Sequence, residues 1–315
     1  MNKNNKIKKT VIFVGYQCNN RCRFCNEANK RELYNKNTQQ VKKEMLEARD
    51  RKTTYLELIG GEMTIRSDIL ELISFAKELR FKTITMATNG RMFSYPKLVE
   101  KIIKAGLTNI VFSIHGHKSE IHDYLTQSPG SFKQLLKGLN NFKKLGFDKI
   151  GSNTTIVKQN YKYLPQIGRF IYEQGIRNSE FIFVDPSHGA AFNFFDKLVP
   201  KISHVAPFVH QCLDIGKKNN VAHWHIRYVP LCYFTNYLGQ VSELQEIKTF
   251  KTEHIAPDFY DPNAEEGRRH IGRAKTKRCE GCSLYDKCEG IWKEYLKHYG
   301  DKEFNPVNKN GKIIL

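Results

Sequence analysis

The sequence predicts an α/β protein in which parallel strands and helices build a barrel or a partial barrel. Three observations predict this class. Short apolar runs alternate with amphipathic segments through the first 185 residues, the connections between them are short, and several of the apolar runs end near glycine, as at Gly15, Gly60, Gly90 and Gly116. Repeated strand–helix units favour a parallel sheet with helices outside, and the functional residues of such barrels lie in the loops that follow the strands.

Six strands are expected where short runs are rich in apolar and β-branched residues: 11–14, 55–59, 83–87, 109–114, 149–157 and 181–184. Helices are expected between them, because apolar residues recur there at helical spacing: 39–52, 68–79, 96–105, 131–145 and 163–174. Ser67 is the expected N-cap of the second helix, and Pro96 occupies the first turn of the third. Glycine follows the last three helices and stops them, at Gly106, Gly146 and Gly175.

The strand–helix alternation ends at Pro186, after which the pattern changes. The expected elements are then a loop, a helix, a strand and a final helix, over residues 187–200, 203–218, 223–229 and 291–299. We therefore expect a partial barrel over residues 1–190 and a small, cysteine-containing C-terminal region over residues 191–315.

The composition is that of a folded protein with no membrane segment. Hydrophobic residues make up 40% of the 315 residues, which is enough for one large domain or two smaller ones. No apolar stretch approaches the roughly 20 residues that span a bilayer, and the Lys- and Asn-rich start lacks the apolar core of a secretory signal. A soluble, cytoplasmic protein without a membrane partner is expected. The net charge of +19 indicates either an anionic partner or a general enrichment in lysine.

The eight cysteines occur in groups, which favours metal or cluster binding over a disulfide framework. The first group is Cys18-x3-Cys22-x2-Cys25, in the loop after the first expected strand. Three thiolates bind three irons of a [4Fe–4S] cube and leave the fourth iron open to a chelating ligand. A structural zinc site is the competing interpretation, although no histidine lies nearby to complete it.

At these residues the sequence resembles the radical S-adenosylmethionine (SAM) enzymes. Their motif is C-x3-C-x-aromatic-C, and Phe24 supplies the aromatic residue. Gly60-Gly61-Glu62, after the second expected strand, resembles the family's Gly-Gly-Glu motif, which contacts the SAM amino group. The sequence departs from the family pattern at Met63, where a proline is usual.

Three further polar residues match positions that hold SAM in similar enzymes. Asn89, Ser113 and Asn153 lie near the ends of the third, fourth and fifth expected strands, where the resemblance implies contacts with the SAM carboxylate and ribose. An ordinary Asn-Gly turn at Asn89, and ordinary small polar strand residues at the other two, are the alternatives. The resemblance covers about residues 10–185 and implies a partial (βα)6 barrel.

The resemblance also implies cofactors and a partner. These are a [4Fe–4S] cluster, SAM, and a reductant such as flavodoxin or ferredoxin. One electron from the cluster would cleave SAM to methionine and a 5′-deoxyadenosyl radical, which abstracts hydrogen from a substrate that the protein orients. No side chain is assigned as the catalytic residue. His122 with Asp123 is a candidate for proton transfer, but is expected instead to orient the helix after the fourth strand.

The second group of cysteines lies in the C-terminal region. Cys279-x2-Cys282-x5-Cys288 needs one more thiol to complete a set of four, and Cys232 is the obvious candidate. This block resembles the SPASM and twitch regions of radical SAM enzymes and implies one auxiliary [4Fe–4S] cluster; a zinc ribbon is the alternative. Cys212 stands alone in an expected helix and is expected to be a buried thiol.

Enzymes with such C-terminal regions often modify ribosomally made peptides, so a peptide is the first expected substrate. A small-molecule metabolite, such as a sugar, an alcohol or a nucleotide, is the alternative. RNA modification is a third interpretation, prompted by the charge of +19, but no recognisable RNA-binding module supports it. The aromatic residues 192–195 and 233–234 are expected either to line a route for the peptide or to form core.

Overall fold

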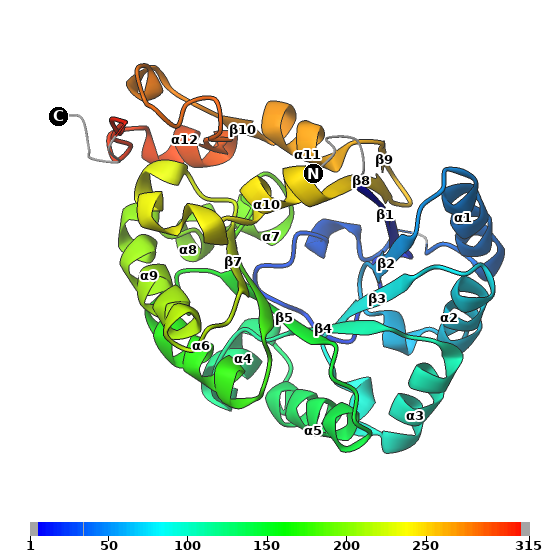
Figure 1. Cartoon of the computed structure of the whole chain (residues 1–315). Coiled ribbons are helices and arrows are strands. Elements are labelled where there is room, and N and C mark those ends of the chain that lie inside the picture. The colour runs from blue at the N-terminus through cyan, green and yellow to red at the C-terminus, as the bar shows by residue number, and fades with distance from the viewer. Residues whose placement is uncertain (1–5, 34, 310–315) are drawn as a thin grey trace. The chain divides into compact units, whose positions relative to one another are not determined.

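The computed structural model describes residues 6–33 and 35–309 and shows a mixed α/β fold. Its main sheet has nine strands in the order β7-β6-β5-β4-β3-β2-β1-β8-β9 (Figure 1). The pairs β1–β2, β2–β3, β3–β4, β4–β5, β6–β7 and β1–β8 are parallel, and only β8–β9 among the described pairs of this sheet is antiparallel. The strands are β1 (Ile7–Phe13), β2 (Tyr55–Ile59), β3 (Thr83–Thr88), β4 (Asn109–Ser113), β5 (Ile150–Ile156), β6 (Asn178–Phe183), β7 (His223–Arg227), β8 (Phe250–Ile255) and β9 (Tyr260–Asp261).

Six helices follow the strands β1 to β5, two of them after β4, and the partial-barrel class is confirmed. The sequence predicts all of them except the first helix after β4. They are α1 (Thr38–Asp50), α2 (Ile69–Glu78), α3 (Pro96–Ala105), α4 (Ser119–Thr126), α5 (Ser131–Lys144) and α6 (Leu164–Glu173). Asn37 closes the N-terminus of α1 in a reciprocal capping box with Gln40. The helix α3 begins at Pro96, and Gly106, with a φ of 122°, is its C-cap.

The structure corrects the expected elements at three places. The final helix expected over residues 291–299 begins only at Lys293, because Ile291–Trp292 forms a short strand. Ser67 is not the N-cap of α2: Asp68 occupies that position, and its carboxylate accepts hydrogen bonds from the Arg66 side chain. Residues 187–200 are not simply a loop, because they contain α7 (Gly189–Asn193) and α8 (Phe195–Leu198). Both short helices place small or apolar side chains in the interior, and that burial stabilises them.

The first of two compact units comprises Met1–Cys22, Glu27–Asn153 and Thr249–Ala264. Alternate side chains of its strands are buried, so that Leu56 and Leu58 of β2 have no exposed surface. The late segment β8 belongs to this unit because it pairs with the edge of β1 that β2 leaves open, with Ile7 opposite Phe250. The sequence expectations did not include this strand.

The second unit comprises Arg23–Asn26, Thr154–Lys248 and Glu265–Leu315. Its further elements are α9 (Ile202–Lys218), α10 (Ser242–Thr249), α11 (Ala264–Gly267), β10 (Arg273–Ala274), β11 (Ile291–Trp292) and α12 (Lys293–Tyr299). The strands β10 and β11 form a separate antiparallel pair. Cys212 is buried in α9, as predicted. Its Sγ faces Gly168 and would lie 2.6 Å from a Cβ added there. The division of the sequence at residue 190 stays a prediction.

No helix within the described ranges is long and apolar enough to cross a membrane.

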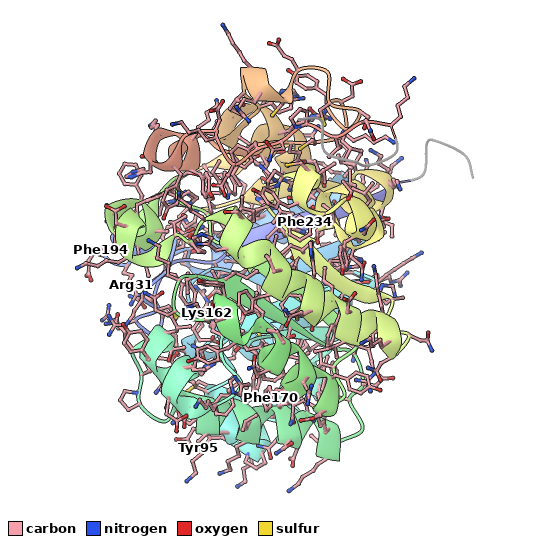
Figure 2. All side chains as sticks on the ribbon, turned by 90° about the vertical axis from the view of Figure 1, so that its left-hand side faces the viewer. Arg31, Tyr95, Lys162, Phe170, Phe194 and Phe234 are labelled. Carbon is pink, nitrogen blue, oxygen red and sulfur yellow. The ribbon has the colours of Figure 1, made fainter. Side chains whose placement is uncertain are left out.

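The aromatic residues proposed to line a peptide route divide into two classes. Phe194 is 53% exposed (Figure 2). Phe195 and Phe234 are buried, so these two belong to the core.

Candidate functional site

The loop between β1 and α1 carries Cys18, Cys22 and Cys25, all of them half-buried. The backbone N–H of Asn20 donates to Cys18 Sγ at 3.3 Å, and the Asn89 side chain donates to the same sulfur at 3.8 Å. Donors of this kind stabilise a thiolate and are typical of sulfur ligands in iron–sulfur sites. Among residues 6–33 and 35–309, no three His, Cys, Asp or Glu side chains come together as ligands of a single metal ion.

The Arg91 side chain fixes the start of this loop to the rest of the first unit. Its guanidinium donates to the Asn19 carbonyl and to Asn20 Oδ1, the latter at 3.0 Å, while its Nε donates to Gln134 at 2.7 Å. Arg31 donates to the Asn20 carbonyl at 2.9 Å. Arg91 was not among the predicted site residues, although its place directly after Asn89-Gly90 is a signal that could have identified it.

The Gly-Gly-Glu segment packs against the backbone of the cysteine loop. The N–H of Gly61 donates to the Gly15 carbonyl at 2.9 Å, and the N–H of Glu62 donates to the Gln17 carbonyl at 2.8 Å. A Cβ added at Gly61 would lie 1.9 Å from the Gln17 oxygen, and one at Gly60 would lie 2.3 Å from the Gly15 oxygen. Both glycines are therefore needed for the close approach of these two loops.

Glu62 is buried and joins the ends of β2 and β3. Its Oε1 accepts hydrogen bonds from the Thr64 N–H at 3.1 Å, the Thr64 hydroxyl at 2.5 Å and the Thr88 hydroxyl at 2.8 Å. Its Oε2 accepts one, from the Asn89 N–H at 2.7 Å. Burial raises the pKa of Glu62, and these four donors oppose that rise. Oε2 keeps the capacity to accept a further donor.

The remaining predicted SAM-binding residues lie in the first unit, two of them at strand ends and Asn153 in the middle of β5. Asn89 is buried after β3, and its amide also donates to Asn19 at 2.7 Å, so it is more than a turn residue. Ser113 of β4 and Asn153 of β5 are direct partners in the parallel register and are both half-buried. Register partners place their side chains on the same face of a sheet, so the structure brings these two residues together.

His122 and Asp123 have separate structural tasks. His122 Nδ1 accepts a hydrogen bond from the His115 N–H at 3.2 Å, and burial lowers the pKa of His122 to about 4. The Asp123 carboxylate accepts from the Gly130 N–H at 2.8 Å and the Phe132 N–H at 2.7 Å, at the start of α5. These contacts agree with the prediction that this segment orients the helix after the fourth strand.

All four C-terminal cysteines line one pocket of the second unit, between the short 3-10 helix Leu231–Tyr233 and β11. They are Cys232, Cys279, Cys282 and Cys288, and apolar residues such as Pro230 and Ile291 line the same pocket. Cys288 Sγ accepts from the Leu231 N–H at 3.4 Å and the Gly290 N–H at 3.3 Å. Cys282 Sγ accepts from the Val307 N–H at 3.4 Å. Four thiols in an apolar pocket with backbone donors form a donor set that suits an iron–sulfur cube.

Comparison with curated proteins gives relatives with different names and activities. An AdoMet-dependent heme synthase of Methanosarcina barkeri is 30% identical over 132 residues, which are 42% of this chain and 37% of that protein. The mycofactocin maturase MftC of Mycolicibacterium smegmatis is 27% identical over 161 residues, which are 51% of this chain and 40% of that protein. The chain thus matches less than half the length of either relative.

Comparison with solved structures extends the similarity in fold to the C-terminal region. Streptococcus suis SuiB bound to S-adenosylmethionine has a TM-score of 0.66 at 19% identity, and the match covers 93% of this chain and 74% of that one. SuiB bound to its precursor peptide SuiA has a TM-score of 0.67. The family model of the radical SAM superfamily matches residues 12–171, about half of the chain, and includes all three cysteines of the first group. With its cysteine loop and Gly-Gly-Glu segment in contact in the fold, this chain belongs to the radical SAM superfamily.

Proposed function

We propose that this radical SAM enzyme modifies a ribosomally made peptide, using a SAM-binding cluster and a second, auxiliary cluster. The observation that carries the cofactor part is the pair of cysteine sets: three thiols on the loop that packs against the Gly-Gly-Glu segment, and four thiols that line one pocket of the second unit. A set of three leaves an iron for SAM, whereas a set of four saturates its cube.

The residues of the cysteine loop and of the Gly-Gly-Glu segment would each have a defined task. Cys18, Cys22 and Cys25 would hold three irons of the cluster, with Cys18 already supported by two N–H donors. Glu62 would offer Oε2 to the SAM ammonium, because its other oxygen is occupied by three donors.

Three other side chains would bind the rest of SAM. Asn89, Ser113 and Asn153 would bind its carboxylate and ribose, the last two as a pair across β4 and β5. When bound and reduced, these cofactors supply a 5′-deoxyadenosyl radical, and the chain's own residues orient SAM and exclude water from it.

Two comparisons support a peptide substrate. MftC is named a maturase, and SuiB has been crystallised with its precursor peptide SuiA. The SuiB fold matches 93% of this chain, and therefore most of its C-terminal region. The exposed Phe194 of the second unit is a candidate for contact with such a peptide.

A small-molecule substrate is the second candidate. The heme synthase of Methanosarcina barkeri favours it, since its name gives heme, a small molecule, as the product. The two candidates share the cofactor chemistry and differ only in what is presented to the radical.

The test begins with the anaerobically reconstituted protein, SAM and a strong reductant. We expect 5′-deoxyadenosine, measured by liquid chromatography and mass spectrometry, and its loss in the triple variant C18A/C22A/C25A. The matched control is Cys212→Ala, which removes a buried thiol outside both sets. Undiminished 5′-deoxyadenosine production by the triple variant would refute the assignment of these three ligands.

The substrate is then tested with short peptides encoded beside the gene. A mass loss of two hydrogens per event, present with wild type and absent with the triple variant, supports peptide crosslinking. Unchanged peptides, together with 5′-deoxyadenosine production stimulated by a sugar, alcohol or nucleotide, would move the assignment to the small-molecule candidate.

A further inference from the structure

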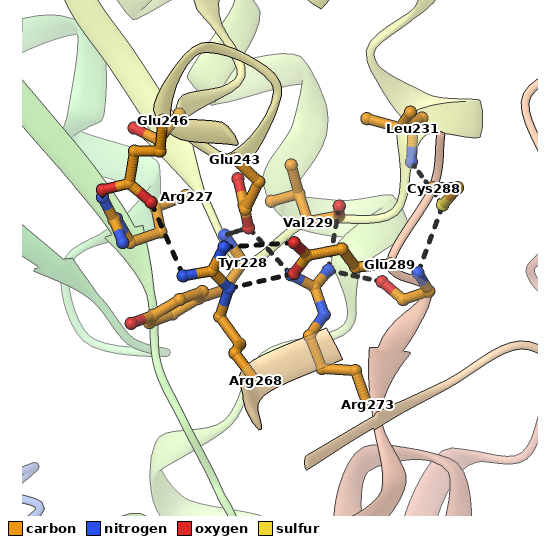
Figure 3. A network of polar contacts seen from close by, with 12 residues as sticks. Arg227, Tyr228, Val229, Leu231, Glu243, Glu246, Arg268, Arg273, Cys288 and Glu289 are labelled. Carbon is orange, nitrogen blue, oxygen red and sulfur yellow. Dashed lines mark hydrogen bonds and ion pairs between the residues drawn. The ribbon is translucent and has the colours of Figure 1, made fainter. Parts of the chain in front are cut away.

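Arg273 of β10 is a fully buried arginine beside the pocket of four cysteines. Its side chain has 0% exposed surface. One terminal nitrogen donates to Glu243 at 2.8 Å and to Glu289 at 3.2 Å. The other donates to two backbone carbonyls, those of Val229 at 3.1 Å and of Gly290 (Figure 3).

The two carbonyls belong to the two segments that bring distant thiols to the pocket. Val229 precedes Cys232 by three residues, and Gly290 follows Cys288 by two. The same segments meet at a sulfur, since Cys288 Sγ accepts N–H donors from both Leu231 and Gly290. One nitrogen of Arg273 therefore holds together two stretches of chain that are more than fifty residues apart in sequence.

Stability alone does not account for this arrangement. Arg268 also pairs with Glu289 through two nitrogens, at 3.0 and 3.1 Å, and Arg227 pairs with Glu246 (Figure 3). Buried ion pairs of this kind cost so much desolvation that well-packed apolar residues of similar volume are often as stable or more stable. A guanidinium offers something that apolar side chains lack, namely a rigid fork with donors in fixed directions.

We propose that Arg273 is a positioning residue for the auxiliary cluster: its fork sets the Cys232 and Cys288 segments at the separation that lets four thiols hold one cube. The inference rests on the proposed auxiliary cluster. It names Arg273, which is not one of the four ligands, as a residue on which binding of that cluster depends. A lysine at this position keeps the charge but is a single ammonium, which cannot reproduce two carbonyl contacts together with two carboxylate contacts in one plane.

The test uses the C18A/C22A/C25A background, so that only the auxiliary cluster contributes iron. We expect about four irons per chain in this parent. Adding Arg273→Lys should remove more than half of that iron and alter the electron paramagnetic resonance spectrum of the reduced cluster that remains.

A second variant shows whether loss of iron comes from the lost contacts of Arg273 or from an unbalanced buried charge. In R273Q/E243Q one charge of each sign is removed, Glu289 stays paired with Arg268, and the new amide oxygen at position 243 can still accept the Tyr228 N–H. It should lose iron like Arg273→Lys, with unchanged far-UV circular dichroism. The matched control is Lys293→Gln, which removes a charge from an exposed residue of the same unit and should retain the parent's iron and spectrum.

Three outcomes would overturn the inference. If Arg273→Lys and R273Q/E243Q both bind four irons and give the parent's spectrum, the guanidinium of Arg273 is not needed to position the cluster ligands. Loss of the folded circular dichroism signal in both variants would assign Arg273 to the fold of the whole unit instead. A parent that binds no iron, or zinc in its place, would refute the auxiliary cluster itself, and this result is distinguishable because it precedes any change at Arg273.

Discussion

At the scale of single residues, Glu62 shows how one carboxylate can serve both the fold and a ligand. Three donors from Thr64 and Thr88 occupy Oε1, while Oε2 receives, among the residues that the structure describes, the Asn89 N–H alone. A buried carboxylate without such partners would be strongly disfavoured, so the donors keep an acidic group in this interior position. The oxygen with one donor is the part of the side chain that remains for a cationic group.

Glu62→Gln should therefore weaken SAM binding while the cluster remains bound. The substitution removes the negative charge, and a hydrogen bond to a charged group contributes about 1.5–3 kcal/mol, so a decrease in affinity of about 10-fold or more is expected. Equilibrium dialysis of SAM against the reconstituted protein measures this, with iron content determined in parallel. Glu71→Gln is the control, since Glu71 is an exposed carboxylate that pairs with Lys42. An unchanged SAM affinity in Glu62→Gln would contradict the proposed role.

At the scale of elements, α4 is positioned by a buried pair of histidines. The His115 and His122 rings stack at a centroid distance of 5.8 Å, and burial lowers the pKa of both. Neutral rings are therefore part of the native packing between the end of β4 and α4. Asp123, the next residue, accepts N–H groups at the start of α5 and so connects the two helices.

This arrangement predicts a loss of stability in mild acid. The folded pKa of His122 is about 4, whereas an unfolded histidine has a pKa near 6.5. Below about pH 6.5 the unfolded chain takes up a proton that the folded chain does not, so the free energy of unfolding falls until the pH reaches the folded pKa. The contribution of His122 lost between pH 7 and pH 4.5 is about 2 kcal/mol.

Denaturant unfolding of wild type and His122→Gln over this pH range measures that contribution. The variant should lose about 2 kcal/mol less than wild type between pH 7 and pH 4.5, because glutamine does not titrate there. His223→Gln, at an exposed position of β7, should behave like wild type. Parallel pH profiles for wild type and His122→Gln would contradict the assignment.

At the scale of the whole molecule, the two cysteine sets differ in how the chain assembles them. The first set lies within eight residues of one loop, from Cys18 to Cys25. The second combines Cys232 with a block that begins at Cys279, so it forms only when the second unit has folded. The two sets should therefore load independently of each other's ligands.

Iron analysis of ligand variants tests this independence. Full reconstitution should give about eight irons per chain, and either C18A/C22A/C25A or a variant with alanine at all four C-terminal cysteines should give about four. The Cys212→Ala control should retain about eight, since that thiol is buried in α9 away from the pocket of cysteines. Zinc in place of the second four irons would show that the C-terminal set is a zinc site.

The sequence by itself determined the features that depend on neighbours along the chain. The spacing of Cys18, Cys22 and Cys25, the Gly-Gly-Glu segment and the alternation of the first six strands with helices are local, and local patterns specify local structure. The sequence placed Ser113 and Asn153 on two successive strands, but their direct pairing in the register came from the structure.

Only the tertiary structure decided the contacts between residues distant in sequence. No local pattern shows that β8 pairs with β1, that Arg91 holds Asn19 and Asn20, or that the Arg273 side chain meets the carbonyls of Val229 and Gly290. The helices in residues 187–200 were missed for a related reason, since their stability comes from burial of one face rather than from helical propensity. The partner that a charged or apolar side chain meets depends on which distant segments the fold brings together. That in turn depends on all the contacts of the fold and not on any single segment.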